Sequence, residues 1–320
     1  MKYLIITICI LSLFITNLLG QQKDTVYFAK LKEAETKIIK LNEGYSLFSQ
    51  SFGTGKIKIL FLNGGPGNTF EAFDIFKSQL PLDKFQLIFY DQLGGYFSDI
   101  PKDTTVWNIP RFVDEVEQVR KFYNLDKFYL LGHSWGGLLA MEYELKYRSN
   151  LKGIIVSNKS YSQKNLIDTR YERLTKIAID SNCSAQTIQE LKNHELYSDT
   201  LDADKIEPAF YRNYTLRLDS IPIPMKTSAR HVTIGKFVKY FKDRQVWDIS
   251  PRLSQIKTPT LIIGGASDFV RVSDLKYMHK KIKKSTLFIC PNGGHFSFWD
   301  DSINYFKGLK KFIDKTENSR

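Results

Sequence analysis

The sequence predicts an α/β protein whose mostly parallel central sheet is covered by helices and carries an inserted, mainly helical cap. Short continuous apolar runs alternate with segments of helical spacing, such as residues 110–123 and 138–147. Such runs are typical of parallel strands that are buried on both faces. The alternation stops over a polar stretch from about residue 161 to residue 245 and then resumes, which favours one interrupted sheet over two independent domains. The predicted strands are 37–41, 45–52, 56–62, 85–90, 127–131, 153–157, 260–263 and 286–289.

The interrupted pattern divides the chain into three parts. They are a signal peptide at 1–20, a core at 21–158 and 246–320, and a helical cap at 159–245. In the first part, Lys2 precedes an almost unbroken apolar run, and polar residues begin abruptly at Gln21. A charged start, a short apolar run and a small residue at Gly20 predict an exported protein, periplasmic or secreted, that is cleaved after Gly20. Because the apolar run borders on spanning length, an N-terminal membrane anchor is the alternative.

The composition is that of an ordinary globular protein with a basic surface. Hydrophobic residues make up 42% and charged residues 25% of the chain, which excludes a disordered or fibrous protein. The formal net charge is +12, with lysine pairs at 280–281, 283–284 and 310–311 on segments that resemble helices. No nucleic-acid-binding motif accompanies these pairs, so we expect a solvated face and no nucleic-acid partner. A basic face also favours weak association with an anionic envelope surface.

Cysteine usage and metal-ligand spacing indicate no covalent framework and no cofactor. Cys9 leaves with the signal peptide, so Cys183 and Cys290 remain, and we expect two buried free thiols rather than a disulfide. No cluster with metal-ligand spacing and no cofactor motif is found in the sequence. We therefore predict that activity withstands EDTA, and a loss of activity in EDTA would contradict this.

A nucleophile motif stands between the fifth predicted strand and a helix. It reads Gly132-x-Ser134-x-Gly136, followed by Gly137. In this context the serine occupies a sharp, strained turn that projects its hydroxyl above the sheet, and the flanking residues must be small. The helix that begins behind the turn directs backbone N–H groups at the reacting oxygen. The motif predicts the α/β-hydrolase fold with Ser134 as nucleophile.

A serine hydroxyl needs a base and an orienting carboxylate, which this fold supplies in the order Ser, acid, His from loops after later strands. His295 follows the last predicted strand in a Gly-Gly-His loop and is the remaining candidate for the base. Asp268 follows the preceding strand, and Asp274 is the fallback acid, although it resembles the start of a helix. The other four histidines, which fall in the elbow, the cap or a helix, are His133, His194, His231 and His279.

The oxyanion hole requires two N–H donors. One is expected from Trp135, the residue after the nucleophile, and the other from Gly65 in the loop after the third predicted strand. Removing one such donor costs about 2.7–4 kcal/mol of transition-state stabilisation. On this interpretation, Gly65→Pro deletes an N–H and should cripple turnover without unfolding the protein.

Several of these motifs together resemble those of the proline iminopeptidases, α/β-hydrolase enzymes that remove N-terminal proline from peptides. The family's H-G-G-P-G loop corresponds to residues 63–67, its Y-D-Q-L-G-x-x-x-S-D stretch to 90–99 and its G-H-S-W-G-G elbow to 132–137. The resemblance implies catalytic roles for Ser134, Asp268 and His295. Segments that look especially like flavobacterial members are 107–109, 112–117, 247–249, 258–260 and 290–295.

The resemblance is weaker in the cap and at one loop residue. Family members carry a G-P-x-E segment whose Glu holds the substrate's α-ammonium, but residues 235–237 here read Gly-Lys-Phe. The first residue of the loop is Asn63 in place of the family's His. Because a partly desolvated ammonium needs a carboxylate, we expect a cap carboxylate at the site. The candidates are Glu190, Glu195, Asp199 and Glu207.

We therefore expect an exported serine aminopeptidase that releases an N-terminal proline or small residue from short peptides. The expected substrate-binding residues are Gly64, Trp135 and Glu207. A carboxylesterase or amide hydrolase with an apolar acyl pocket is the alternative, consistent with Phe237 and Phe241. A non-catalytic binding protein is a third possibility, which the intact set of three catalytic side chains opposes.

Overall fold

A computed structural model describes residues 35–193, 202–233 and 238–319. Its centre is one eight-stranded sheet in the order β1-β2-β4-β3-β5-β6-β7-β8. Strand β2 pairs in antiparallel fashion with both β1 and β4, and all the pairings from β4 to β8 are parallel. The strands are β1 (Glu35–Lys40), β2 (Ser46–Phe52), β3 (Ile57–Leu62), β4 (Phe85–Tyr90), β5 (Phe128–His133), β6 (Leu151–Ser157), β7 (Thr260–Gly265) and β8 (Ser285–Cys290).

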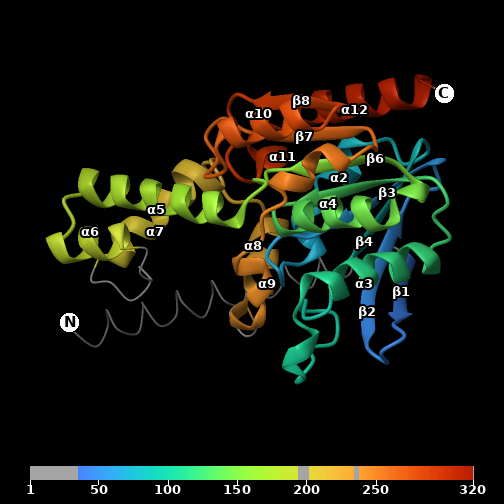
Figure 1. Ribbon diagram of the computed structural model, residues 1–320, viewed down its shortest axis with the longest axis horizontal. Helices are drawn as coiled ribbons and strands as arrows, with labels where there is room; N and C mark the ends of the chain where they lie inside the picture. Colours follow the sequence, from blue (N-terminus) through green and yellow to red (C-terminus); the bar gives the residue numbers. More distant parts are fainter. Residues whose placement is uncertain (1–34, 194–201, 234–237, 320) are drawn as a thin grey trace, which may run out of the picture.

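Helices cover both faces of this sheet, so the central strands are apolar along their whole length. One face packs against α3 (Ile109–Phe122), α4 (Trp135–Tyr147) and α10 (Val272–Lys281). The other face packs against a 3-10 helix (Phe70–Phe73) and against α2 (Phe76–Gln79), α11 (Ser297–Asp300) and α12 (Ser302–Asn318). Figure 1 shows the sheet enclosed between these layers. The expected α/β-hydrolase fold is confirmed.

The insertion between β6 and β7 is mainly helical. Figure 1 shows α5, α6 and α7 grouped to one side of the sheet, with α8 and α9 below it. The first group has a small core of its own around Leu174, Leu191 and Ile206, which are all fully buried. The helices are α5 (Gln163–Asp180), α6 (Ala185–Lys192), α7 (Ala203–Phe210), α8 (Ile223–Arg230) and α9 (Lys242–Gln245). The limits of the cap at 159 and 245 stay a prediction.

Each predicted strand forms, with ends that shift by up to a few residues. Helix α4 begins at Trp135, three residues before the predicted start, because the chain enters the helix directly from the turn at Ser134. Helix α3 begins as expected with Pro110 in its first turn, and the side chain of Asn108 caps it by accepting a hydrogen bond from the Arg111 N–H. The lysines at 283–284 lie in the turn before β8 and not on a helix, which corrects that expectation.

The structure answers the prediction on the cysteines, whereas several other predicted features fall outside the described residues. Cys183 and Cys290 are buried free thiols. The signal peptide at 1–20, together with His194, Glu195, Asp199 and the segment 235–237, lies outside the described residues. Within the described ranges, no helix is both long and apolar enough to cross a membrane.

Candidate active site

The nucleophile turn has the strained geometry that its sequence motif predicts. Ser134 joins β5 to α4 with φ 53° and ψ −114°, a backbone conformation that residues other than glycine rarely adopt. A Cβ on Gly132 would lie 2.0 Å from the Gly136 carbonyl oxygen, and one on Gly136 would lie 2.1 Å from the Leu62 carbonyl oxygen. Both positions therefore require glycine so that the turn can pack against β3.

The structure pairs His295 with Asp268 beside this turn. The two residues follow β8 and β7, and the distance from His295 Nδ1 to Asp268 Oδ1 is 2.9 Å. The imidazole stacks on Phe269 with ring centroids 4.1 Å apart, and it lies 4.9 Å from the ring of His133, the neighbour of Ser134. With Nδ1–H donated to the carboxylate, Nε2 is the nitrogen that remains to take up a proton.

Two further donors hold the buried Asp268 carboxylate. Val270 N donates to Oδ1 at 3.1 Å, and Asn158 Nδ2 donates to Oδ2 at 2.8 Å. The same Asn158 amide also donates to the Gly294 carbonyl at 3.0 Å, so it links the acid to the loop that carries the imidazole. Sequence reasoning missed Asn158, although its place directly after β6, at the edge where Ser134 and Asp268 also lie, was a usable signal.

The fallback acid, Asp274, is not part of this pairing. It lies in the first turn of α10 and accepts a hydrogen bond from Ser160 Oγ at 2.6 Å. Asn165 Nδ2 is its second partner, at 3.5 Å. Of the two candidate carboxylates, only Asp268 contacts the imidazole of His295.

The ring of His133, the residue before Ser134, is buried and packs against aromatic side chains. It is 2% exposed, and neither ring nitrogen has a hydrogen-bond partner among the described residues. Burial holds its pKa well below the usual range, and the nearby His295 lowers it further. Its ring packs on Phe296 and Phe298, with centroids 4.9 and 5.1 Å away. We infer that His133 fills space as an aromatic ring and takes up no proton.

The glycine loop after β3 lies against Ser134. A Cβ on Gly64 would be 3.4 Å from Ser134 Cβ, which places the backbone of the loop beside the hydroxyl-bearing carbon. Asn63 anchors the loop because its Nδ2 donates to the Tyr90 carbonyl at 3.0 Å. Gly65 has φ +110°, whereas proline fixes φ near −65°. Gly65→Pro would therefore distort the loop as well as delete an N–H, so a loss of turnover in this variant would not report on the missing donor alone.

The side chain and backbone of Trp135 have different surroundings. Its indole is 2% exposed, donates from Nε1 to Gln92 Oε1 at 2.8 Å, and packs on Phe112 and Phe241. The expected contact of Trp135 with substrate can therefore come only from its backbone. As the first residue of α4, it has an N–H with no partner inside the helix, which suits an oxyanion donor. Phe241 is fully buried in this aromatic cluster, whereas Phe237 lies outside the described residues.

Gly64→Ala tests the loop better than the proline variant does. The new Cβ would meet Ser134 Cβ at 3.4 Å and His133 Cδ2 at 3.3 Å, distances that a small adjustment relieves. We expect a folded protein whose kcat falls by about 10²–10³-fold, because the methyl group displaces the oxyanion donors from the reacting oxygen. Steady-state kinetics and a thermal melt check this. A folded variant with unchanged kcat would move the second donor elsewhere.

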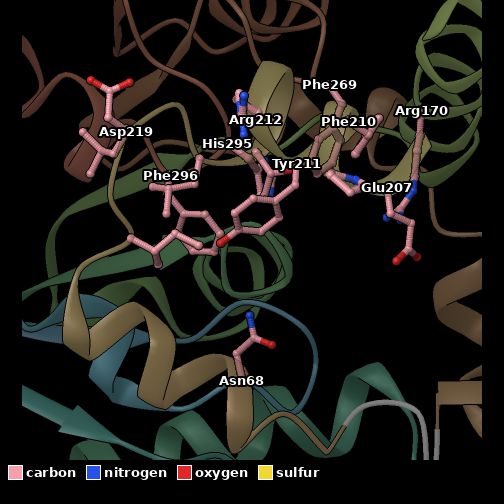
Figure 2. Close-up of a pocket in the computed structure, with 15 residues that line it drawn as sticks. Asn68, Arg170, Glu207, Phe210, Tyr211, Arg212, Asp219, Phe269, His295 and Phe296 are labelled. Carbon is pink, nitrogen blue, oxygen red and sulfur yellow. The ribbon is translucent and has the colours of Figure 1, made fainter. Parts of the chain in front are cut away.

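A pocket of about 670 Å³ opens next to His295 between the core and the cap. Its lining includes Asn68, Phe269 and Phe296 from the core and Glu207 from α7, as Figure 2 shows. Of the two described cap carboxylates expected at the site, Glu207 lines this pocket, and Glu190 lies on α6 hydrogen-bonded to Gln186. Sequence reasoning missed the other charged residues of the lining, which are Arg170, Arg212 and Asp219.

The cap is attached directly to the loop that carries the imidazole. His295 N donates to the Tyr214 carbonyl at 2.8 Å. Asp300 accepts from Gly294 N at 2.8 Å and from Arg217 N at 2.7 Å, so its carboxylate joins the loop to the cap. Burial raises the pKa of Asp300 to about 6. Among the described residues, no group of side chains could hold a metal ion.

Comparisons with known proteins agree with this geometry. Residues 58–302 match the family model described as the alpha/beta hydrolase fold. A proline iminopeptidase of Flavobacterium johnsoniae is 36% identical over 291 residues, 86% of this chain and 96% of the relative. One of Elizabethkingia meningoseptica is also 36% identical, over 84% of this chain and 94% of the relative.

Solved structures support the same fold. The crystal structure of a Mycobacterium smegmatis proline iminopeptidase superposes with a TM-score of 0.75 at 18% identity, covering 89% of this chain and 99% of that one. The structure of VinJ gives a TM-score of 0.75 at 20% identity, covering 88% and 98% of the two chains. The resemblance seen in the motifs is confirmed, and we conclude that this chain is a serine hydrolase that belongs to the proline iminopeptidase family of α/β hydrolases.

Proposed function

We propose that this chain is an exported aminopeptidase that releases an N-terminal proline or small residue from short peptides through Ser134, His295 and Asp268. The observation that carries the proposal is the 2.9 Å contact between the His295 imidazole and the Asp268 carboxylate beside a strained serine turn. The curated relatives that are named proline iminopeptidases supply the substrate class.

The chemistry proceeds in two steps. His295 Nε2 takes the hydroxyl proton as Ser134 Oγ attacks the carbonyl carbon, and the backbone N–H groups of Trp135 and Gly65 stabilise the oxyanion. The C–N bond then breaks, and the leaving amine takes the proton from His295. Water, deprotonated by the same imidazole, releases the amino acid and regenerates the serine. Asp268 stays ionised throughout and orients the imidazole.

Recognition of the substrate amine falls to Glu207 in this proposal. Glu207 lines the same pocket as His295, and an N-terminal ammonium that is partly desolvated there requires a carboxylate. The side chain lies on the cap, so it would face a peptide that enters between cap and core. Glu207→Gln is expected to raise KM for a prolyl substrate and to leave the hydrolysis of a neutral acyl ester unchanged.

The second candidate is a carboxylesterase or amide hydrolase. The apolar part of the pocket lining favours it, because Phe210, Leu216, Phe269 and Phe296 could surround a short acyl chain. This candidate differs from the first in needing no carboxylate for an amine.

One assay separates the candidates. Purified protein is offered prolyl and alanyl p-nitroanilides and p-nitrophenyl acyl esters in parallel, with Ser134→Ala as the control. Hydrolysis of the aminoacyl substrates that disappears in Ser134→Ala supports the aminopeptidase. Hydrolysis of acyl esters alone would establish the esterase, and no hydrolysis of any substrate would favour a non-catalytic binding protein.

Export is tested separately. We expect the mature protein recovered from the envelope or medium of a Gram-negative host to begin at Gln21. A full-length chain in the membrane fraction would instead establish the N-terminal anchor. Release from membranes by high salt would indicate that the basic surface makes the weak envelope contact.

A further inference from the structure

A buried lysine leaves the sheet between the nucleophile and the acid. In the sheet, β6 lies between β5 and β7, which carry Ser134 and Asp268 at their carboxyl ends, and Lys159 is the second residue after β6. A Cβ on Gly137 would be 2.9 Å from Lys159 Cβ, so the lysine side chain starts directly against the first turn of α4. Ligands of open α/β sheets bind at this carboxyl edge. Lys159 thus lies at the edge of the sheet that carries Ser134 and Asp268.

The surroundings of Lys159 provide no counter-charge. The residue is 2% exposed, its Nζ donates to Gln163 Oε1 at 3.2 Å, and the amine stands 5.0 Å from the centre of the Trp247 ring. Among the described residues, no carboxylate forms an ion pair with it. Burial and, as the second cause, the positive charge of Arg244 lower the pKa of Lys159 to about 7.

A second cation, Arg244 on α9, is half-buried and lies three residues before the same tryptophan. Its backbone carbonyl accepts a hydrogen bond from Trp247 N at 3.3 Å, in the turn that ends α9. No ion pair of its guanidinium is found within the described ranges, and burial lowers its pKa to about 10, with Arg170 as the second cause. Arg170 on α5 lines the pocket next to His295. The charge of Arg170 thus acts on Arg244, and that of Arg244 acts on Lys159.

A buried amine without a counter-charge is unfavourable, and the positive charge of the half-buried Arg244 adds repulsion; an anion bound by both cations would relieve the desolvation and the repulsion. We propose that Lys159 and Arg244 form a carboxylate-binding subsite, so that the preferred substrates of Ser134 carry a carboxylate close to the scissile bond. This inference rests on the proposed hydrolytic function and specifies its substrate class. The carboxylate is either the free C-terminus of a dipeptide or an acidic side chain of the N-terminal residue, since both present the same group; the second source would widen the substrate range proposed above beyond proline and small residues.

Matched substrate pairs test the proposal and separate the two sources. Glutamyl and glutaminyl p-nitroanilide differ in a side-chain carboxylate, and Pro-Gly and Pro-glycinamide differ in a terminal one. We expect the charged member of at least one pair to have a kcat/KM at least about tenfold higher than its neutral partner. Wild-type enzyme that cleaves the neutral members equally fast or faster, or that cleaves none of the four, overturns the subsite.

Variants show whether the two cations cause the preference. Lys159→Met and Arg244→Gln should each lower kcat/KM for the preferred charged substrate about tenfold and change that for its neutral partner much less. Lys159→Arg should retain most of the preference. Lys164→Met is the matched control, because Lys164 is exposed on α5 and paired with Asp168. Equal losses on charged and neutral substrates would mean a merely structural role.

Labelling with a fluorophosphonate distinguishes failure of this proposal from failure of the proposed function. The reagent reacts with an activated serine whatever the substrate specificity. A Ser134 that labels but shows no preference for carboxylates contradicts the subsite alone. A Ser134 that does not label contradicts the hydrolytic mechanism, and the subsite falls with it.

Discussion

Asp268→Asn is expected to lower kcat by about 10⁴-fold while the protein stays folded. Each oxygen of this carboxylate faces donors: His295 Nδ1 and Val270 N at one oxygen, and Asn158 Nδ2 at the other. An asparagine has one acceptor and one donor at these positions. Asn158 cannot turn to help, because its amide also donates to Gly294 O and Ser297 Oγ. The substituted amide therefore either opposes Asn158 or forces the imidazole into the tautomer that cannot accept the serine proton.

Asp274→Asn is the matched control for this variant. It makes the same chemical change at the other candidate acid, which contacts Ser160 and Asn165 instead of the imidazole. We expect kcat within about threefold of wild type, because no reacting group is touched. Stopped assays on the best substrate and circular dichroism of both variants provide the comparison. A large loss of kcat in Asp274→Asn with activity retained in Asp268→Asn would reverse the assignment of the acid.

Lys159→Met is expected to stabilise the protein, and by more at neutral than at alkaline pH. Burial lowers the pKa of this amine from 10.5 to about 7. The native state therefore disfavours the charged form of the amine. The resulting loss of folding stability is absent above pH 10.5, grows as the pH falls towards 7 and is complete below that. A change of that size corresponds to about 5 kcal/mol at its maximum. Loss of the contacts with Gln163 and Trp247 offsets about 1–2 kcal/mol.

Urea unfolding at two pH values measures this effect. At pH 6 the variant should be more stable than wild type by about 3 kcal/mol, and the difference should shrink by pH 9. Methionine keeps the unbranched stem of the lysine, so packing beside Gly137 is preserved. Lys164→Met should show no comparable pH-dependent gain. A Lys159→Met protein that is less stable than wild type at both pH values would mean that the amine has a counter-charge in the native state. A stabilising variant that loses substrate preference would fit a binding site retained at the expense of stability.

The strands and the nucleophile turn could be predicted because their signals are local. Continuous apolar runs identify buried parallel strands, and the spacing of Gly132, Ser134 and Gly136 reflects contacts within a few residues and with the adjacent strand. Asp268 and His295 could be predicted for a related reason. Parallel strands end at one edge of the sheet, so a polar residue that follows each of two later strands is brought to the same place as the serine.

The remaining features depend on partners far away in the chain. The Asn158 amide donates to three acceptors, and Asp300 accepts a hydrogen bond from Arg217 N. These contacts join segments far apart in the chain, so no local sequence pattern predicts them. The φ of Gly65 is equally invisible in the sequence, which is why the proline variant was a poor choice. In the cap, the sequence offered several carboxylates with equal weight, and only the folded arrangement of α7 brings Glu207 to the pocket.

The most direct measurement is the rate at which a fluorophosphonate labels the wild-type protein and His295→Ala, with the adduct located by mass spectrometry. The reagent reacts with a serine only when an adjacent base activates the hydroxyl. We predict a single adduct on Ser134 in the wild type and a rate that falls by orders of magnitude in the variant. Equal rates in the two proteins, or an adduct on another residue, would contradict activation of Ser134 by His295.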